Sequence, residues 1–277
     1  MIEAAKKVVI IQAENPDGDS LGSALALEEI LGDLGKGTAL YCDVEMPKYL
    51  RYINGWDRVT QDFDTSVDLA IIVDTSSDTL ISKALELPGV RHFLESHPVL
   101  VIDHHNLTAS TLSFNHTLIN EPAVATGEAL FYLAKHAGWD INPAAAEAML
   151  AGILSDSLGL STQSTTAESF EAAAGLVKLG AKPHELEGRR REFMKKSADI
   201  LAYKGRLIER IEYLLDGKLT GKLRANVPIA EQVAGFFGGG GHAYAAGFRV
   251  HEQYDKIVQE LVTATDKALV DYESSIS

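Results

Sequence analysis

The sequence predicts an α/β fold, with an N-terminal parallel-sheet domain flanked by helices, a helical connector and a small C-terminal α/β domain. Its 277 residues suffice for two domains of ordinary size. Hydrophobic residues make up 46% of the chain and charged residues 23%, the composition of a globular protein with a buried core. Four short apolar runs with almost no polar alternation recur early in the chain, as in strands that a parallel sheet buries on both faces: Val8–Ile11, Thr38–Tyr41, Leu69–Val73 and Val99–Ile102.

Helices are expected between and after these runs. An amphipathic stripe from Leu21 to Leu34 predicts a helix that ends at Gly35, with Asp19 or Ser20 as its cap. A helix between two strands implies a right-handed crossover. Two more helices are expected over 125–138 and 143–154, the second with a proline in its first turn. These elements together predict an α/β domain over residues 1–185.

The second half of the chain is expected to hold a connector and a small domain. The stretch 188–215 has a helical pattern with a basic start, so residues 186–215 are interpreted as a helical connector. A glycine run at 238–241, a strand at 248–250 and a last helix over 254–272 predict a small α/β domain at 216–277.

Charge and cysteine content exclude several classes of protein. Lys plus Arg number 25 against 39 for Asp plus Glu, a net charge of −14 that disfavours binding of long duplex nucleic acid. Binding of a short anionic ligand at a local site stays open as an alternative. Cys42 is the only cysteine, which rules out a disulfide framework and a cysteine-based zinc site. The apolar runs are too short for a signal peptide or a membrane span, so we expect a cytoplasmic protein without a membrane partner; a homodimer stays open.

The first candidate motif is Asn-Pro-Asp-Gly-Asp-Ser at 15–20, where the first strand gives way to the first helix. Ligands of parallel sheets bind at this carboxyl edge. Asp17 and Asp19, two residues apart, can each reach a different metal ion. The alternative is an ordinary turn with an aspartate cap.

Acidic and imidazole side chains end two further strands. Asp74 follows the third apolar run, and Asp103, His104 and His105 follow the fourth. Asp156, at the end of an apolar helix, is a further candidate. Carboxylates with one or two histidines suit a two-metal site that polarises a phosphoryl group and makes hydroxide from water. The alternatives are a capping aspartate beside two surface imidazoles, and a polar helix end.

Four glycines at 238–241 precede His242. Such a run lets the backbone approach an anion closely, and a helix beginning at His242 would add its positive end. The alternative is a flexible linker.

In order along the chain, these motifs resemble those of the DHH phosphoesterases with a DHHA1 domain. The resemblance is greatest to the subgroup of nanoRNases and 3′-phosphoadenosine 5′-phosphate phosphatases, which are exonucleases of very short RNA. It implies two manganese ions, with Mg²⁺ or Co²⁺ as alternatives. It also implies the ligands of each ion: Asp17 binds one ion, Asp74 bridges the two, and the other ion is bound by Asp19, His104 and Asp156.

The resemblance also implies roles around these ions. Asp74 is then part of the catalytic centre, His105 contacts the substrate phosphate, and Asp103 orients the histidines. The glycines Gly239, Gly240 and Gly241 hold the far end of the nucleotide together with His242.

The chain departs from the family pattern at two places. Ala13 stands where the family has a histidine that ligates the first ion, so one site is expected to be weak; Gln12 and Glu14 point to the opposite face of a strand from position 13. The segment 215–237 is shorter than a usual DHHA1 domain. There Lys-Leu-Arg at 222–224 is similar to the family's Ser-Leu-Arg-Ser, which makes Arg224 either a phosphate ligand or an ordinary surface arginine.

The leading hypothesis is a metal-dependent phosphoesterase that hydrolyses short 5′-phosphorylated oligoribonucleotides or 3′-phosphoadenosine 5′-phosphate through a metal-bound hydroxide. One alternative is a phosphodiesterase of linear or cyclic dinucleotides. Another is a nucleotide-binding protein with little turnover, because of Ala13.

Overall fold

A parallel sheet of six strands forms the centre of the first of two units in the chain. The computed structural model describes residues 1–105, 110–193, 200–203, 207–213, 219–225 and 227–276. The units comprise residues 1–194 and 195–277. The first sheet has the order β3-β2-β1-β4-β5-β6, and its strands are β1 (Lys7–Ile11), β2 (Gly37–Tyr41), β3 (Val59–Thr60), β4 (Leu69–Val73), β5 (Val99–Asp103) and β6 (Thr117–Asn120).

The four strands predicted from apolar runs are confirmed to within one residue at each end. The central strand β1 pairs with β2 on one side and β4 on the other, with Val9 opposite Ala39 and Ala70. The short edge strands β3 and β6 lack a continuous apolar run, because an edge strand is less enclosed, and the sequence pattern did not indicate them.

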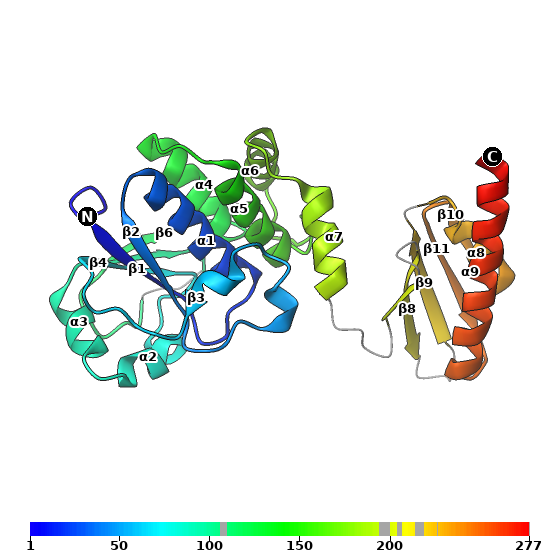
Figure 1. Cartoon of the computed structure of the whole chain (residues 1–277), viewed down its shortest axis with the longest axis horizontal. Helices are drawn as coiled ribbons and strands as arrows, with labels where there is room; N and C mark the ends of the chain where they lie inside the picture. The colour runs from blue at the N-terminus through cyan, green and yellow to red at the C-terminus, as the bar shows by residue number, and fades with distance from the viewer. Residues whose placement is uncertain (106–109, 194–199, 204–206, 214–218, 226, 277) are drawn as a thin grey trace. The chain divides into compact units, whose positions relative to one another are not determined.

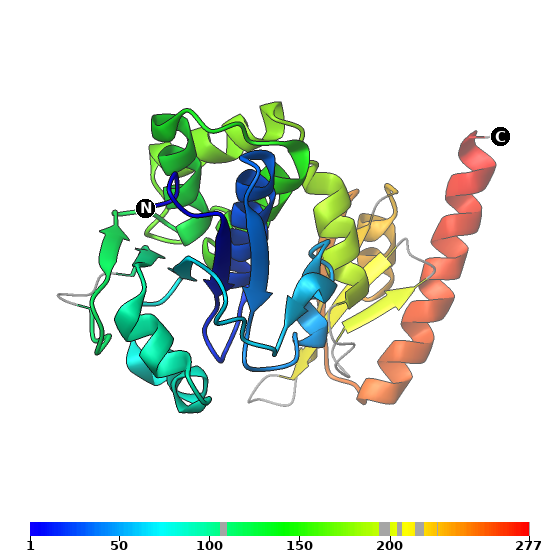
Figure 2. The ribbon, with the colours of Figure 1, turned by 60° about the vertical axis from the view of Figure 1, so that its left-hand side comes forward.

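Helices cover both faces of this sheet, as Figures 1 and 2 show. Alternate residues of β1 therefore enter different cores: Ile10 belongs to the same core as Leu25 of α1, and Ile11 to the same core as Phe93 of α3. The helices of the first unit are α1 (Gly18–Asp33), α2 (Ser82–Glu86), α3 (Val90–Ser96), α4 (Thr126–Ala137), α5 (Pro143–Asp156), α6 (Ala167–Lys178) and α7 (Pro183–Phe193), with 3₁₀ turns η1 (Lys48–Leu50), η2 (Trp56–Arg58) and η3 (Asp78–Ile81).

The expected helix between the first two strands is confirmed, but its cap is different. Asp17, rather than Asp19 or Ser20, is the N-cap of α1, and its side chain accepts hydrogen bonds from the backbone N–H groups of Asp19 and Ser20. The Ser20 hydroxyl oxygen accepts a hydrogen bond from the Asp17 N–H at 3.1 Å, which completes a capping box.

The second unit contains an antiparallel sheet with two helices and its own core. The strand order is β10-β11-β9-β8-β7. Phe248, Leu223 and Leu261 are buried in the core of this unit. Its elements are β7 (Ile200–Tyr203), β8 (Leu207–Tyr213), β9 (Leu219–Ala225), α8 (Ala230–Phe236), β10 (Gly240–His242), β11 (Ala245–Val250) and α9 (Tyr254–Ile276).

The helical connector expected over 186–215 is wrong for most of its length. Helix α7 ends at Phe193, and residues 200–203 and 207–213 are strands of the second sheet. Strand β8 pairs with β9 along seven residues, so tertiary pairing overrides the helical pattern there. Lys195 and Lys196, which belong to the basic start of that stretch, lie outside the described residues. Within the described residues, no helix combines the length and the apolar character that a membrane span needs.

Candidate metal centre

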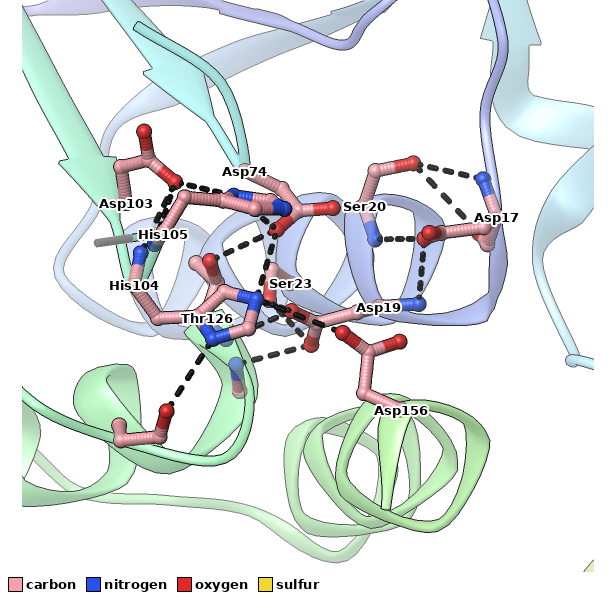
Figure 3. Close-up of polar contacts among 12 residues, drawn as sticks. Asp17, Asp19, Ser20, Ser23, Asp74, Asp103, His104, His105, Thr126 and Asp156 are labelled. Carbon is pink, nitrogen blue, oxygen red and sulfur yellow. Dashed lines mark hydrogen bonds and ion pairs between the residues drawn. The ribbon is translucent and has the colours of Figure 1, made fainter. Parts of the chain in front are cut away.

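The predicted acidic and imidazole residues lie at the carboxyl edge of the parallel sheet. Asp74 follows β4, and Asp103 ends β5, directly before the two histidines. The start of α1 contributes Asp19, and the last residue of α5 is Asp156. Figure 3 shows the side chains of these residues converging from four elements that are distant in sequence.

The His104 imidazole faces three carboxylates. Its Nε2 lies 3.3 Å from Asp156 Oδ2, 3.5 Å from Asp74 Oδ1 and 3.7 Å from Asp19 Oδ2. Its Nδ1 lies 3.2 Å from the carbonyl oxygen of Ala123, which places the proton of a neutral ring on Nδ1 and leaves the Nε2 lone pair toward the carboxylates. This Nε2 is buried and has no hydrogen-bond partner among the described residues.

These atoms fit a divalent cation. Two groups of side chains each bring their ligand atoms within 4.8 Å of one another: Asp19, His104 and Asp156, and Asp74, His104 and His105. A set of carboxylate oxygens with imidazole nitrogen suits manganese and related ions. The orphaned Nε2 is explained if a cation accepts its lone pair.

Asp19 is held by the start of α4, a contact that the sequence did not predict. Its Oδ2 accepts the Thr126 N–H at 2.6 Å, and its Oδ1 accepts the Gly127 N–H at 3.0 Å. The Thr126 hydroxyl donates to Asp74 Oδ1 at 3.0 Å. Thr126 therefore orients two of the predicted metal ligands. The only sequence signal was a Thr-Gly pair at the start of an expected helix.

Helix α5 approaches Asp19 closely at a glycine. A Cβ built on Gly152 would lie 2.4 Å from Asp19 Oδ1, so no larger residue fits without displacing the carboxylate. Gly152, four residues before Asp156, thus has a packing role beside the metal centre.

Crowded negative charge shifts the proton affinities of the cluster. Burial, then repulsion from Asp156, raises the pKa of Asp19 to about 6. Burial, then the Asp19 charge, raises the pKa of Asp74. Burial alone would lower the pKa of His104, but its close contact with the Asp156 carboxylate and the Asp19 charge outweigh burial and raise the pKa to about 9. A bound cation would relieve this repulsion.

Asp103 anchors the segment that carries the histidines. Its Oδ1 lies 2.8 Å from His105 Nδ1 and accepts both histidine backbone N–H groups, at 2.9 and 3.2 Å. Its Oδ2 accepts from Ser76 Oγ at 2.8 Å. Burial opposes ionisation, but these hydrogen bonds lower the pKa of Asp103, and the Asp103 carboxylate raises the pKa of His105. His105 is half exposed and therefore reachable by a ligand.

Asp17 and the residues around Ala13 stand apart from the cluster. Asp17 caps α1 and belongs to neither group of converging ligand atoms (Figure 3). Ala13 is buried and contributes only its carbonyl oxygen, which accepts from Cys42 Sγ at 3.4 Å. Glu14 is engaged elsewhere, by Ser82 and the Lys83 N–H. Gln12 is buried, and its amide has no partner among the described residues.

The predicted nucleotide-holding residues lie in the second unit. His242 ends strand β10, so the helix expected to begin there is wrong: pairing with β11 takes its backbone. His242 and Arg224 both pair with Ala245 from opposite sides, which places them on one face of the sheet.

The glycine run itself packs against β11. A Cβ on Gly239 would lie 2.2 Å from the Gly247 carbonyl oxygen, whereas one on Gly240 would meet nothing within 4 Å. Gly241 is the central residue of β10 and has a φ of 153°. Close backbone approach thus explains Gly239.

Comparisons with known proteins identify relatives of this chain. Residues 7–153 match the N-terminal domain of the DHH family. The bifunctional oligoribonuclease and PAP phosphatase NrnA of Mycoplasma genitalium is 30% identical over 187 residues, 65% of this chain and 55% of that protein. A probable manganese-dependent inorganic pyrophosphatase of Bacillus licheniformis is 29% identical over 200 residues, 71% of this chain and 62% of that protein. The matched region thus spans less than two thirds of either relative.

A solved structure extends the likeness to both units. An exopolyphosphatase-related protein from Bacteroides fragilis superposes with a TM-score of 0.63 at 20% sequence identity, covering 99% of this chain and 94% of that one. The fold of the entire chain is therefore similar to that of a known protein.

Proposed function

The chain belongs to the DHH family of metal-dependent phosphoesterases, and from this premise we propose that it acts in the cytoplasm on short 5′-phosphorylated oligoribonucleotides, on 3′-phosphoadenosine 5′-phosphate, or on both. The observation that carries the proposal is the buried, unpartnered Nε2 of His104 among three carboxylates. Hydrolysis of a phosphate ester is accelerated by positive charge next to the phosphoryl oxygens. Metal ions supply such charge, and the side chains of this cluster suit the binding of metal ions.

In this proposal Asp19, His104 and Asp156 would hold one manganese ion, Asp17 would hold a second, and Asp74 would serve both. When bound, such ions supply Lewis-acid polarisation of phosphoryl oxygens and activation of water. The second ion is held weakly, because Ala13 offers no lone pair.

His105 and Asp103 act on the substrate itself. The Asp103 carboxylate stabilises the protonated form of His105 across their 2.8 Å contact. A cationic, half-exposed imidazole beside the metal centre can donate a hydrogen bond to a phosphoryl oxygen or protonate the leaving oxygen. Arg224 and His242, on one face of the second sheet, hold the part of the nucleotide that is not cut.

One assay tests this proposal against its alternatives. Purified protein is given Mn²⁺ and a panel of 5′-phosphorylated diribonucleotide, longer oligomers, 3′-phosphoadenosine 5′-phosphate, cyclic dinucleotides and pyrophosphate. We expect release of mononucleotide or phosphate from the first three, and loss of all release in Asp74→Asn. Turnover of pyrophosphate alone would instead favour the activity that the name of the Bacillus relative states.

A nucleotide-binding protein with little turnover is the second candidate. Ala13 and the position of Asp17 outside the cluster favour it, because both weaken the second ion site. Binding of the diribonucleotide without its cleavage, at saturating Mn²⁺, would decide for this candidate.

A further inference from the structure

A cavity of about 640 Å³ opens in the first unit between α5, α7 and the segment after η1. Its lining is mixed: Leu158 and Leu186 are apolar, Tyr52 and Ser155 carry hydroxyl groups, and Arg190 and Arg191 of α7 are cationic. None of these residues is among the proposed metal ligands, and of the six only Ser155 lies in a motif that carries the family resemblance.

The cavity borders the metal centre directly. Ser155 precedes the predicted ligand Asp156, and Gly18 separates Asp17 from Asp19. A Cβ on Gly18 would lie 2.5 Å from Ser155 Oγ and 3.6 Å from the Tyr52 hydroxyl oxygen. The first turn of α1 thus faces the metal cluster and also touches the cavity wall.

The arginines of α7 have different partners. Arg189 is an anchor: it donates to the Tyr52 carbonyl oxygen at 3.0 Å and pairs with Glu147. Arg190 and Arg191 share one carboxylate, that of Glu187, at 2.6 and 3.0 Å. Two guanidinium groups against one carboxylate leave an excess of positive charge in the cavity, although the chain as a whole is acidic.

Tyr52 lines the cavity, and charged groups of α7 and of the start of α1 both act on its hydroxyl group. Burial raises its pKa, the positive charge of Arg190 opposes this, and the negative charges of Glu187 and Asp17 add to it. The phenol therefore stays protonated at neutral pH and can donate a hydrogen bond to an anion.

We propose that this cavity binds a second phosphate of the substrate, separated by one nucleoside from the phosphate at the metal centre. Arg190 and Arg191 pair with that phosphate, as guanidinium groups do bidentately with phosphate oxygens. Leu158, which is largely exposed, packs against the nucleoside between the two phosphates. The inference rests on the proposed function. It makes α7 a determinant of specificity, because α7 would favour oligonucleotides over small phosphate esters that have one phosphate.

The test compares two substrates in one double variant, Arg190→Gln with Arg191→Gln. Losing two charge-assisted contacts should raise the KM for 5′-phosphorylated triadenylate by about tenfold or more. The kcat for bis-p-nitrophenyl phosphate, which has no second phosphate, should change far less. Arg58→Gln is the matched control, because Arg58 is likewise a partly exposed arginine paired with glutamate, but it does not line the cavity.

A second variant is expected to tighten substrate binding, an effect that a folding defect could not produce. Glu187→Gln removes the carboxylate that competes for both arginines, so it should lower the KM for triadenylate. An unchanged or raised KM in Glu187→Gln, or an unchanged KM in the double variant, overturns the assignment and leaves the proposed function standing.

If the wild-type protein cleaves neither substrate, the proposed function fails and binding still tests the cavity. Calorimetry with triadenylate should then show weaker binding to the double variant than to the wild-type protein. Equal affinity would overturn the inference.

Discussion

His104 shows at the scale of one residue how burial prepares a metal ligand. Its ring is held by a backbone carbonyl on one side, and its other nitrogen is enclosed by carboxylates that lack a countercharge. In the metal-free protein a proton is the cation that fills this place, since the pKa of His104 is raised to about 9. Metal and proton therefore compete for one site.

This competition predicts a pH dependence. The pKa of Asp19 rises from 3.8 to about 6 on folding and that of His104 from 6.5 to about 9. Each group stabilises the metal-free protein at pH values below its unfolded pKa, and this contribution to stability is lost as the pH rises through its folded pKa. A divalent ion needs both groups deprotonated, so the rise in Tm caused by Mn²⁺ should be larger at pH 8.5 than at pH 5.5. Calorimetric scans with Mn²⁺ or a chelator measure it; an equal rise at both values would remove His104 from the metal site.

Ala13 is the residue at which this chain departs most from its family. It lies two positions beyond Ile11, where the pairing of β1 with β4 ends, and it stands where the family resemblance places a histidine that ligates the first ion. Ala13→His should then strengthen the weaker ion site by roughly 10- to 100-fold, because a ligand imidazole is restored there. Titration with Mn²⁺ should show a second tight ion and faster hydrolysis. Ala13→Asn, polar but without imidazole, is the control.

The predicted and the missed residues of the site differ in how they act. Asp74, Asp103 and His104 were predictable because acids and imidazoles at the ends of buried strands have few structural uses. Thr126 and Gly127 act through backbone N–H groups on a carboxylate more than 100 positions earlier, and any residue type carries an N–H. Only the three-dimensional structure could reveal that contact.

At the scale of elements, the crossing of α1 and α5 sets the position of Asp19. Gly152→Ala would place a methyl group against the Asp19 carboxylate and should destabilise the protein by about 1–3 kcal/mol, with weaker Mn²⁺ binding. Gly32→Ala is the control in α1, because a Cβ there meets nothing within 4 Å. That change should stabilise by about 0.5–1 kcal/mol. Denaturant titrations measure both, and equal effects would show that the crossing has more room than its geometry indicates.

Helices and strands were predictable from the sequence where burial produces one clear pattern of apolar residues. The strands β1, β4 and β5 contribute apolar side chains to the cores on both faces of the sheet, so each contains a run of at least four consecutive apolar residues and its bounds follow closely from the sequence. Strand β8, with Leu-Ile-Glu-Arg-Ile-Glu-Tyr, fits a helix or a strand by pattern. Its pairing with β9 decides the outcome, and that partner is not visible in a local window.

On the scale of the molecule, the proposed metal binding and the proposed nucleotide binding are assigned to different units. The cluster of metal ligands lies wholly within residues 1–194, and His242 and Arg224 lie within residues 195–277. Each unit has a hydrophobic core of its own. Changes in the second unit should therefore leave the metal centre intact.

His242→Ala tests this division. Removing the imidazole leaves every metal ligand in place, so the affinity for Mn²⁺ and the hydrolysis of bis-p-nitrophenyl phosphate should stay within about twofold of the wild-type values. The KM for a 5′-phosphorylated dinucleotide should rise by about tenfold, the usual effect of losing one hydrogen bond to a charged group. His251→Ala is the control, since His251 is exposed just beyond β11 in the same unit. Equal losses on both substrates would mean that His242 supports the fold of the second unit, because a binding contact confined to the nucleotide cannot slow the cleavage of an ester that lacks one.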